Sequence, residues 1–418
     1  MSVSSSMPSS INSRSAFSAG FLAWTFDSFD FFILTFVLSQ LARDFHKPIS
    51  AMAFLLTASL LMRPVGAVLF GFLGDRYGRR GPLMVNILFN VCIEVLSGLA
   101  PNYTVMLLLR LCFGIGMGGV WGLGASLAME SVPAQRRGTY SGILQEGYAI
   151  GNLLAAVAFW TVFPRWGWRP MFFLSLVPAL LTVLLLSRVK ENKALRSAAA
   201  AKRDRGSYFR AIAANGKRLL YLSVLMSMMG FLSHGTQDLY PTFLQRQMHF
   251  SPSLTAAIGV IAMIGAILGG TLGGFFSDRF GRRRTMIAAE LFAFVLIPLW
   301  VFPHAVGMLV AGAFLMQFMV QAAWGVIPAY LNELIPDQVR ALLPGFAYQI
   351  GILIASTAPL VEAVATRHFS YGEAMGAVVA VVVLVGAIVI AAGPEARGVV
   401  FGGDTAAAGD KAAERRSG

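Results

Sequence analysis

Charged residues are scarce in this sequence. Asp, Glu, Lys and Arg together make up 13% of the 418 residues, whereas hydrophobic residues make up 56%. A typical soluble domain has about 25% charged and about 45–50% apolar residues. The mean hydropathy of +0.68 is too high for one water-soluble core to bury all the apolar side chains. This composition excludes a soluble enzyme, a disordered regulator and a fibrous chain, and it predicts a protein that is surrounded largely by lipid.

Motifs for covalent chemistry, metal binding and ATP use are also absent. The two cysteines, Cys92 and Cys112, both lie inside apolar runs, which excludes a disulfide framework and a C-x-x-C site. The sequence has no Walker loop, no G-x-S-x-G motif and no His/Cys cluster with metal-ligand spacing. The chain is therefore predicted to be neither an ATP-driven pump nor an enzyme, and no metal or cofactor is expected.

Long apolar runs dominate what is present. Twelve runs have about the 18–25 residues needed to cross a hydrocarbon core of roughly 30 Å, and they are continuously apolar, as membrane helices are. We place them at roughly 17–41, 51–74, 82–100, 104–130, 139–162, 170–187, 218–244, 254–277, 285–302, 305–334, 342–366 and 371–393. Residues 1–16 are rich in Ser and lack an apolar segment, so they are not a signal peptide, and the first run is expected to remain as a helix.

The net charge of +13 is unevenly distributed along the chain. If both termini are cytoplasmic, 25 of the 33 Lys and Arg residues lie on the inner side and six lie in outer loops. The positive-inside rule therefore predicts this orientation, and it explains the basic balance without a nucleic-acid partner.

A polar stretch divides the apolar runs into two sets of six. We expect a cytoplasmic tail at 1–16, six-helix bundles at 17–187 and 218–393, a basic cytoplasmic linker at 188–217 and a disordered cytoplasmic tail at 394–418. The predicted fold class is therefore an all-α membrane protein with twelve transmembrane helices in two bundles.

The two bundles repeat each other at a constant offset of 203 residues. The stretch Gly-Phe-Leu-Gly-Asp-Arg-Tyr-Gly-Arg-Arg at 71–80 matches Gly-Phe-Phe-Ser-Asp-Arg-Phe-Gly-Arg-Arg at 274–283. Further matches pair Trp121 with Trp324, Glu130 with Glu333, Pro133 with Pro336 and Arg137 with Arg340. Parallel repeats of this kind predict a pseudo-two-fold axis along the membrane normal, with a binding site between the halves.

The duplicated loop resembles the cytoplasmic loop motif of the major facilitator superfamily, and the resemblance extends over nearly the whole chain. It implies the major facilitator fold, with two pseudo-symmetric six-helix bundles. Charges beside a tight Gly turn can pair across neighbouring helix ends and bind the negative C-terminal dipole of another helix. A cytoplasmic gate is therefore expected to comprise Asp75, Arg76, Arg79, Asp278, Arg279 and Arg282.

Arg63 is a cation near mid-bilayer, because it precedes Asp75 by 12 residues, or about 18 Å of helix. Its duplicate position is Ala266, so only one half carries it. An ionisable group at this depth costs at least about 2.5–3.5 kcal/mol and usually marks a pathway. The R-P-x-G stretch beginning at Arg63 resembles that of symporters for organic anions, which implies a substrate carboxylate as its partner. A structural ion pair with Asp27 or Asp30 is the alternative.

Asp27 and Asp30 are three residues apart in the first predicted helix, which puts both on one face. Two nearby carboxyl groups in a low dielectric tend to share a proton, because a second charge is expensive. The D-x-F-D-F-F pattern looks like the first helix of acid:proton symporters. Both residues are therefore candidates for proton coupling, with a salt bridge to Arg63 as the alternative.

The helix predicted at 218–244 contains Ser-His-Gly-Thr-Gln-Asp at 233–238. His234 and Asp238 are four residues apart on one face, and the charge of a His can change near neutral pH. The stretch resembles the signature of Jen-type lactate and pyruvate permeases and their bacterial relatives in the sialate:proton symporter family. We assign His234 and Gln237 to substrate binding and Asp238 to proton coupling.

The helix predicted at 139–162 has a stripe of polar residues along one face and is otherwise apolar. Gln145, Tyr148 and Asn152 have the spacing i, i+3, i+7, which suits the wall of a wet cavity, so we assign them to substrate binding. Glu146 lies one position off the stripe. It is either a further proton site or a partner for Arg110.

Together these features imply a proton-coupled secondary transporter that imports a small monocarboxylate, lactate or pyruvate first, by alternating access. Sialic acid or another organic acid is the alternative substrate, and a transporter-like nutrient sensor is the alternative class. As proton carriers, we rank Asp30 first, then Asp238, then Asp27, with Glu146 next. The expected partners are the organic anion, the proton and the bilayer, and the chain is expected to function as a monomer in the inner (plasma) membrane.

Overall fold

The computed structural model describes residues 10–189 and 205–401, and we call these two parts the N-half and the C-half. The described residues form helices and connecting turns, with no strand among them. Twelve of the helical spans in these two parts are long and apolar enough to cross a membrane, which agrees with the twelve predicted runs. The chain is a multi-pass, all-helical membrane protein.

The N-half contains six spans, of which two are broken. The first four are α1 (Ser10–Asp44), α2 (Ile49–Tyr77), α3 (Arg80–Gly98) and α4 (Tyr103–Ser131). The fifth span follows a short 3-10 turn (Ala134–Arg136) and consists of α5 (Arg137–Gln145) and α6 (Gly147–Trp166). The sixth consists of α7 (Arg169–Phe173) and α8 (Leu176–Arg188).

The C-half begins with α10 (Arg205–Ala214), which lies in the predicted linker. Its spans are α11 (Gly216–Gln237) with α12 (Tyr240–Arg246), α13 (Pro252–Phe280), α14 (Arg282–Val301), α15 (Val306–Trp324) with α16 (Ile327–Leu334), α17 (Leu343–Ala355) with α18 (Ala358–Ala365), and α19 (Tyr371–Ala392). A 3-10 turn at Asp337–Val339 precedes α17.

Proline accounts for three of the breaks inside spans. Pro241, Pro328 and Pro359 stand in the first turn of α12, α16 and α18. A proline has no N–H to donate to the carbonyl four residues earlier, so a helix restarts more readily than it continues there. The fifth span breaks without a proline, at Glu146.

Glycine allows neighbouring helices to touch through their backbones. A Cβ atom on Gly118 of α4 would lie 1.9 Å from the carbonyl oxygen of Arg63 in α2, and one on Gly269 of α13 would lie 2.0 Å from that of Phe318 in α15. Helices in lipid have no hydrophobic driving force for association. Small residues at such contacts let the backbones approach closely, so van der Waals packing stabilises the helix pair instead. The close α2–α4 packing therefore fixes the height of Arg63 in its bundle.

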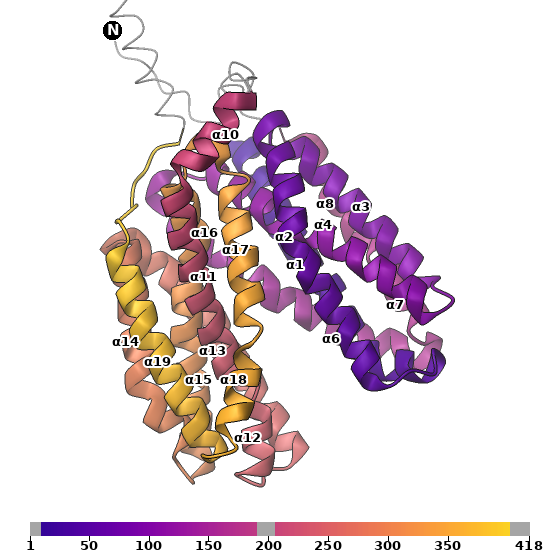
Figure 1. Cartoon of the computed structure of the whole chain (residues 1–418), viewed down its shortest axis with the longest axis vertical. Helices are drawn as coiled ribbons and strands as arrows, with labels where there is room; N and C mark the ends of the chain where they lie inside the picture. The colour runs from indigo at the N-terminus through magenta and orange to yellow at the C-terminus, as the bar shows by residue number, and fades with distance from the viewer. Residues whose placement is uncertain (1–9, 190–204, 402–418) are drawn as a thin grey trace, which may run out of the picture.

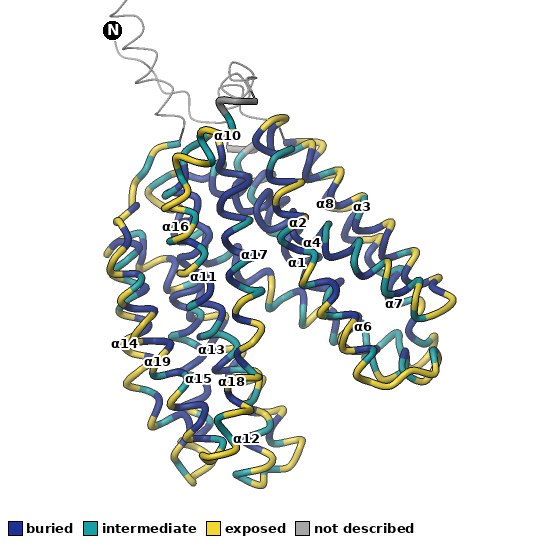
Figure 2. Tube along the Cα trace, viewed as in Figure 1, coloured by how far each residue is buried: buried dark blue, intermediate teal, exposed yellow. Residues whose placement is uncertain are grey.

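The two halves meet at one end and diverge toward the other (Figure 1). The elements that join them are α2, α4 and α5 of the N-half with α13, α16 and α17 of the C-half. In Figure 2 the buried residues concentrate where these helices meet, and the exposed ones lie on the outer faces and the diverging ends. We call the end with α10 the closed end and the opposite end the open end.

Candidate functional site between the halves

Arg63 lies in α2 and is 5% exposed. It forms no ion pair with Asp27 or Asp30, which was the alternative to substrate binding, nor with any other residue in the described part of the chain. Its charge acts on Asp27 in the N-half, on Tyr148 of α6 and on Tyr348 of α17 in the C-half. A buried guanidinium without an ion-pair partner is costly, so this position favours an anionic ligand.

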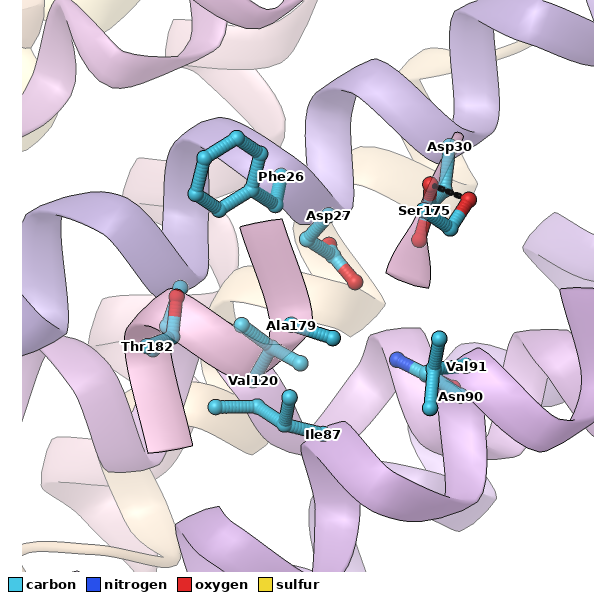
Figure 3. A pocket seen from close by; sticks show the side chains of 11 residues that line it. Phe26, Asp27, Asp30, Ile87, Asn90, Val91, Val120, Ser175, Ala179 and Thr182 are labelled. Carbon is cyan, nitrogen blue, oxygen red and sulfur yellow. Dashed lines mark hydrogen bonds between the residues drawn. The ribbon is translucent and has the colours of Figure 1, made fainter. Parts of the chain in front are cut away.

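Asp27 and Asp30 both lie buried in α1 but have different surroundings. Asp30 accepts a hydrogen bond of 2.5 Å from the Ser175 hydroxyl, whereas neither carboxyl oxygen of Asp27 has a hydrogen-bond partner. Both line a cavity of about 30 Å³ inside the N-half, together with Asn90 and Thr182 (Figure 3). This volume holds about two water molecules, and the polar lining provides partners for them.

Glu94 of α3 is a buried acid that our sequence analysis did not identify. It pairs with Arg110 of α4 at 2.9 Å, and both side chains are fully buried. The interpretation of Glu146 as the partner of Arg110 is therefore wrong. The spacing of residues along one helix could not predict this pairing. The presence of an acid inside a predicted span was nevertheless a usable signal. The same signal identifies Glu290 and Glu362, which are also buried.

The C-half places its predicted polar residues together. His234 Nδ1 lies 3.0 Å from the Asp238 carboxylate, and these side chains are 32% and 36% exposed. Gln237 donates a hydrogen bond of 2.9 Å to Gln317 of α15. The imidazole, the carboxylate and the half-buried Gln237 amide are thus accessible side by side and can hydrogen-bond to a polar ligand, whereas Gln317 is buried behind them.

The predicted stripe on the fifth span extends over the junction of two helices. Gln145 ends α5, whereas Tyr148 and Asn152 belong to α6, and Glu146 between them keeps helical φ and ψ angles. Tyr148 is 37% exposed, and the charges of Arg63 and Asp238 both act on its hydroxyl. Gln145 is buried and Asn152 is half-buried. Tyr148 is therefore within reach of a charge from each half.

Aromatic rings from both halves pack into one cluster around Tyr348 of α17. The Tyr348 ring stacks on Trp121 with centroids 4.1 Å apart, and it meets Trp24 and Trp324 edge-to-face at 6.1 Å and 6.0 Å. Trp24 in turn stacks on Tyr148 at 5.6 Å. Trp121 and Trp324 occupy equivalent positions in the repeat, which was a usable signal for aromatic residues at this level. The repeat does not contain the information that their rings both contact Tyr348.

A first latch joins the halves at the closed end through Asp75. Its carboxylate accepts hydrogen bonds from the backbone N–H groups of Ala341 (2.8 Å) and Leu342 (3.2 Å), where α17 begins. Arg79 lies 3.4 Å away on the same half. The Tyr208 hydroxyl of α10 donates at 3.1 Å, and burial together with the Asp75 charge raises the pKa of Tyr208, which keeps this donor protonated.

A second latch repeats this geometry with the halves exchanged. Asp278 accepts hydrogen bonds from the backbone N–H groups of Gly138 (2.7 Å) and Thr139 (2.8 Å) in the first turn of α5, and it pairs with Arg282 at 2.8 Å. Each aspartate therefore sits at the positive N-terminal end of a helix from the opposite half. The prediction that the gate charges bind the negative C-terminal dipole is wrong for the aspartates.

Arg76 and Arg279 do not take part in these latches. Both are exposed and lie over the neighbouring rings of Tyr77 and Phe280. The two gate arginines that face the interface are Arg79 and Arg282, four residues after each aspartate.

Two glutamates connect the latch arginines across the halves. Glu130 pairs with Arg79 at 3.0 Å and lies 3.9 Å from Arg340 of the C-half. Its equivalent in the repeat, Glu333, pairs with Arg282 at 2.9 Å and with Arg137 of the N-half at 3.0 Å. Glu130, Glu333, Arg137 and Arg340 were recognised as repeat matches but not as gate residues.

The segment after α19 crosses the second latch. Glu395 accepts hydrogen bonds from the backbone N–H groups of Arg282 and Arg283. The Phe401 ring lies between two guanidinium groups, 3.6 Å from Arg137 and 3.8 Å from Arg340. Residues 394–401 of the predicted disordered tail thus contact both halves, while 402–418 lie outside the described residues.

Comparisons with known proteins agree with this architecture. A family model described as Major Facilitator Superfamily matches residues 20–268 and 238–404. The chain is 30% identical over 390 residues to a "Carboxylic acid transporter protein homolog" of Saccharomyces cerevisiae, which covers 87% of this chain and 63% of that relative. The chain therefore spans less than two thirds of the yeast protein's length.

Bacterial relatives match over most of their length. A "Probable 4-methylmuconolactone transporter" of Cupriavidus pinatubonensis is 28% identical, covering 93% of this chain and 92% of the relative. "Sialic acid transporter NanX" of Escherichia coli is 25% identical, covering 87% and 89%. Among solved structures, the proton:xylose symporter XylE has a TM-score of 0.75 at 18% identity, covering 94% of this chain and 98% of XylE.

Proposed function

The chain belongs to the major facilitator superfamily, and on this premise we propose that it is a proton-coupled symporter that imports a small organic carboxylate by alternating access. It is a transporter and not an enzyme. The closed end is the cytoplasmic end in this proposal, so the described conformation faces outward. Both termini then lie in the cytoplasm, and the protein works as a monomer in the inner membrane.

The observation that carries the proposal is the buried, unpaired guanidinium of Arg63. A carboxylate can accept two parallel hydrogen bonds from it and neutralise its charge. The charge of Arg63 also acts on Tyr148, and His234 and Gln237 offer polar contacts from the other half. The relatives named for carboxylic acid, methylmuconolactone and sialic acid transport support an organic acid as the cargo.

Proton coupling follows from the charges around Arg63. Asp27 has no hydrogen-bond partner, and the Arg63 guanidinium is a cation that acts on it. When a substrate carboxylate pairs with the Arg63 guanidinium, that cation no longer stabilises an ionised Asp27. Binding of the anion therefore favours binding of a proton to Asp27. We therefore rank Asp27 ahead of Asp30, which accepts a hydrogen bond from Ser175, as the first proton carrier.

Lactate or pyruvate is the leading substrate, with sialic acid as the alternative. Counterflow of radiolabelled lactate in liposomes tests transport, and competition by unlabelled pyruvate, sialic acid and muconate tests the substrate class. A non-transporting sensor would show no counterflow with any of these acids.

Arg63→Lys tests the assignment of the carboxylate site. Lys keeps the charge but loses the planar fork, so the half-saturation concentration should rise about tenfold or more. Arg76→Lys, at an exposed position outside the site, is the matched control and should leave transport unchanged. An unchanged half-saturation concentration in Arg63→Lys and Arg63→Ala would remove Arg63 from the substrate site.

A further inference from the structure

In the described part of the chain, the fifth and sixth spans of the N-half are each divided into two helices. Of these two junctions, only the one in the fifth span carries an ionisable residue, Glu146. It separates α5 from α6, and it is 6% exposed. A Cβ atom on Gly270 of α13, in the opposite half, would lie 1.9 Å from its Oε1 atom. The carboxyl group of Glu146 is therefore pressed into the contact between the halves.

The contact around Glu146 is tight. Cβ atoms on Gly142 of α5 and Gly325 after α15 would lie 2.4 Å and 2.1 Å from the Gly270 carbonyl oxygen. Three backbones thus converge beside the carboxyl group, and any larger side chain at these glycines would separate them. Such packing leaves little space for water to solvate a charge.

No counter-charge compensates Glu146 in this conformation. Its Oε1 atom has no hydrogen-bond partner, and burial is the sole influence that acts on its ionisation from the described residues. Gly270 of α13, which adjoins it from the opposite half, does not titrate, and no charged group among the described residues acts on it. A charged carboxylate in such surroundings costs several kcal/mol, so Glu146 is neutral when the halves are closed.

The repeat supplies an internal comparison for this position. At the offset of 203 residues, the equivalent of Glu146 is Gln349 of α17, which is 1% exposed. Its amide approaches the Gly118 carbonyl of the opposite half at 3.4 Å. A protonated glutamate has nearly the shape of a glutamine, so both interfaces hold a neutral side chain, but only one of these side chains can ionise.

We propose that Glu146 is a protonation switch for closure of the gate, in which the protonated residue lets α5 pack on α13 and its ionisation separates the halves. The proposal rests on the proposed alternating-access function. When the closed end opens, Glu146 is exposed to water on that side and releases its proton there. It must recover a proton from the same side before closure, so this proton controls the return step and is not the one transported.

The distance between the halves at the closed end is the direct readout. Spin labels attached through Arg76→Cys and Arg279→Cys report it, because these exposed residues follow the latch aspartates on α2 and α13. Cys92→Ser and Cys112→Ser remove the native thiols. In purified protein without substrate, the closed population relative to the open one should fall at least tenfold between pH 6 and pH 8.

Two matched variants separate the contribution of Glu146 to the pH dependence from that of the other acids at the gate. Glu146→Gln copies the neutral partner in the repeat and should stay closed at both pH values. Gln349→Glu should add a second pH-dependent opening. A wild-type population that does not change with pH, or a full pH dependence that persists in Glu146→Gln, would overturn the switch. Absence of lactate counterflow with an intact pH response would instead refute the proposed function alone.

Discussion

The two latches at the closed end are built from the same residues and differ in what lies beside them. In each, an aspartate accepts hydrogen bonds from the first N–H groups of a helix in the opposite half, and an arginine follows four residues later. Asp75 receives a further donor from Tyr208 in α10, whereas the second latch is crossed by the segment that ends at Phe401. Duplication therefore explains the two latches, and segments outside the repeat make them unequal.

Replacing Glu130 and Glu333 should give the largest difference in stability between the two sides. Glu333 is held by two arginines at 2.9 Å and 3.0 Å, while Glu130 has one arginine at 3.0 Å and another at 3.9 Å. Removing one partner from a buried ion pair costs about 3–5 kcal/mol. Glu333→Gln should therefore lower the thermal unfolding midpoint in detergent clearly more than Glu130→Gln does. Equal midpoints would mean that the closer contacts of Glu333 add nothing.

Neutralising the latch aspartates should have the next largest effect. Hydrogen bonds to charged groups contribute about 1.5–3 kcal/mol, and Asp75 is more buried than Asp278. We expect Asp75→Asn to slow turnover more than Asp278→Asn, with half-saturation nearly unchanged in both variants, because the latch stabilises one conformation and does not touch the substrate. Counterflow over a range of substrate concentrations separates the two parameters. A parallel loss of binding and turnover would indicate misfolding instead.

Removing the ring at position 401 should weaken closure through both arginines that it contacts. Each cation–π contact contributes about 0.5–2 kcal/mol, and Phe401 makes one with Arg137 and one with Arg340. Phe401→Ala should increase the open population measured with the spin labels described above. Phe401→Tyr keeps an aromatic ring and serves as the control. If Phe401→Ala and Phe401→Tyr give the same distances, the ring has no part in closure.

The smallest effect is expected at the first latch from Tyr208→Phe. It removes one hydroxyl donor to Asp75 but leaves both backbone donors in place, so the cost should be about 1 kcal/mol. Because the pKa of Tyr208 is raised, the hydroxyl is protonated in wild type and remains a donor to Asp75 at pH 6 and at pH 8, so the open population should be slightly larger in Tyr208→Phe than in wild type. The spin-label distances at both pH values check this.

Composition and periodicity were sufficient to predict the spans and the repeat. Apolar length identified all twelve spans, and the constant offset placed Asp75 and Asp278 at equivalent positions of the repeat. The contact between His234 and Asp238 also followed from spacing, because residues four apart share one face of a helix. These predictions depend on local sequence alone.

Contacts between helices could not be predicted in the same way. Which acid meets Arg110 depends on how α3 and α4 are rotated about their axes, and spacing along one helix does not contain that information. The break at Glu146 has no proline to announce it, and the position of Phe401 depends on the path of a segment that composition alone marked as disordered. The residues missed are those whose partners lie far away in the sequence.

Proton-driven accumulation is the central claim, and Asp27 is its most specific test. Uptake and counterflow of radiolabelled lactate should be compared in the same liposomes, with and without an acid exterior, for wild type, Asp27→Asn and Asp30→Asn. We expect Asp27→Asn to abolish accumulation driven by the pH gradient and to retain exchange of internal for external substrate. If Asp27→Asn still concentrates lactate when the outside is acid, Asp27 is not the proton carrier and the coupling through Arg63 is refuted.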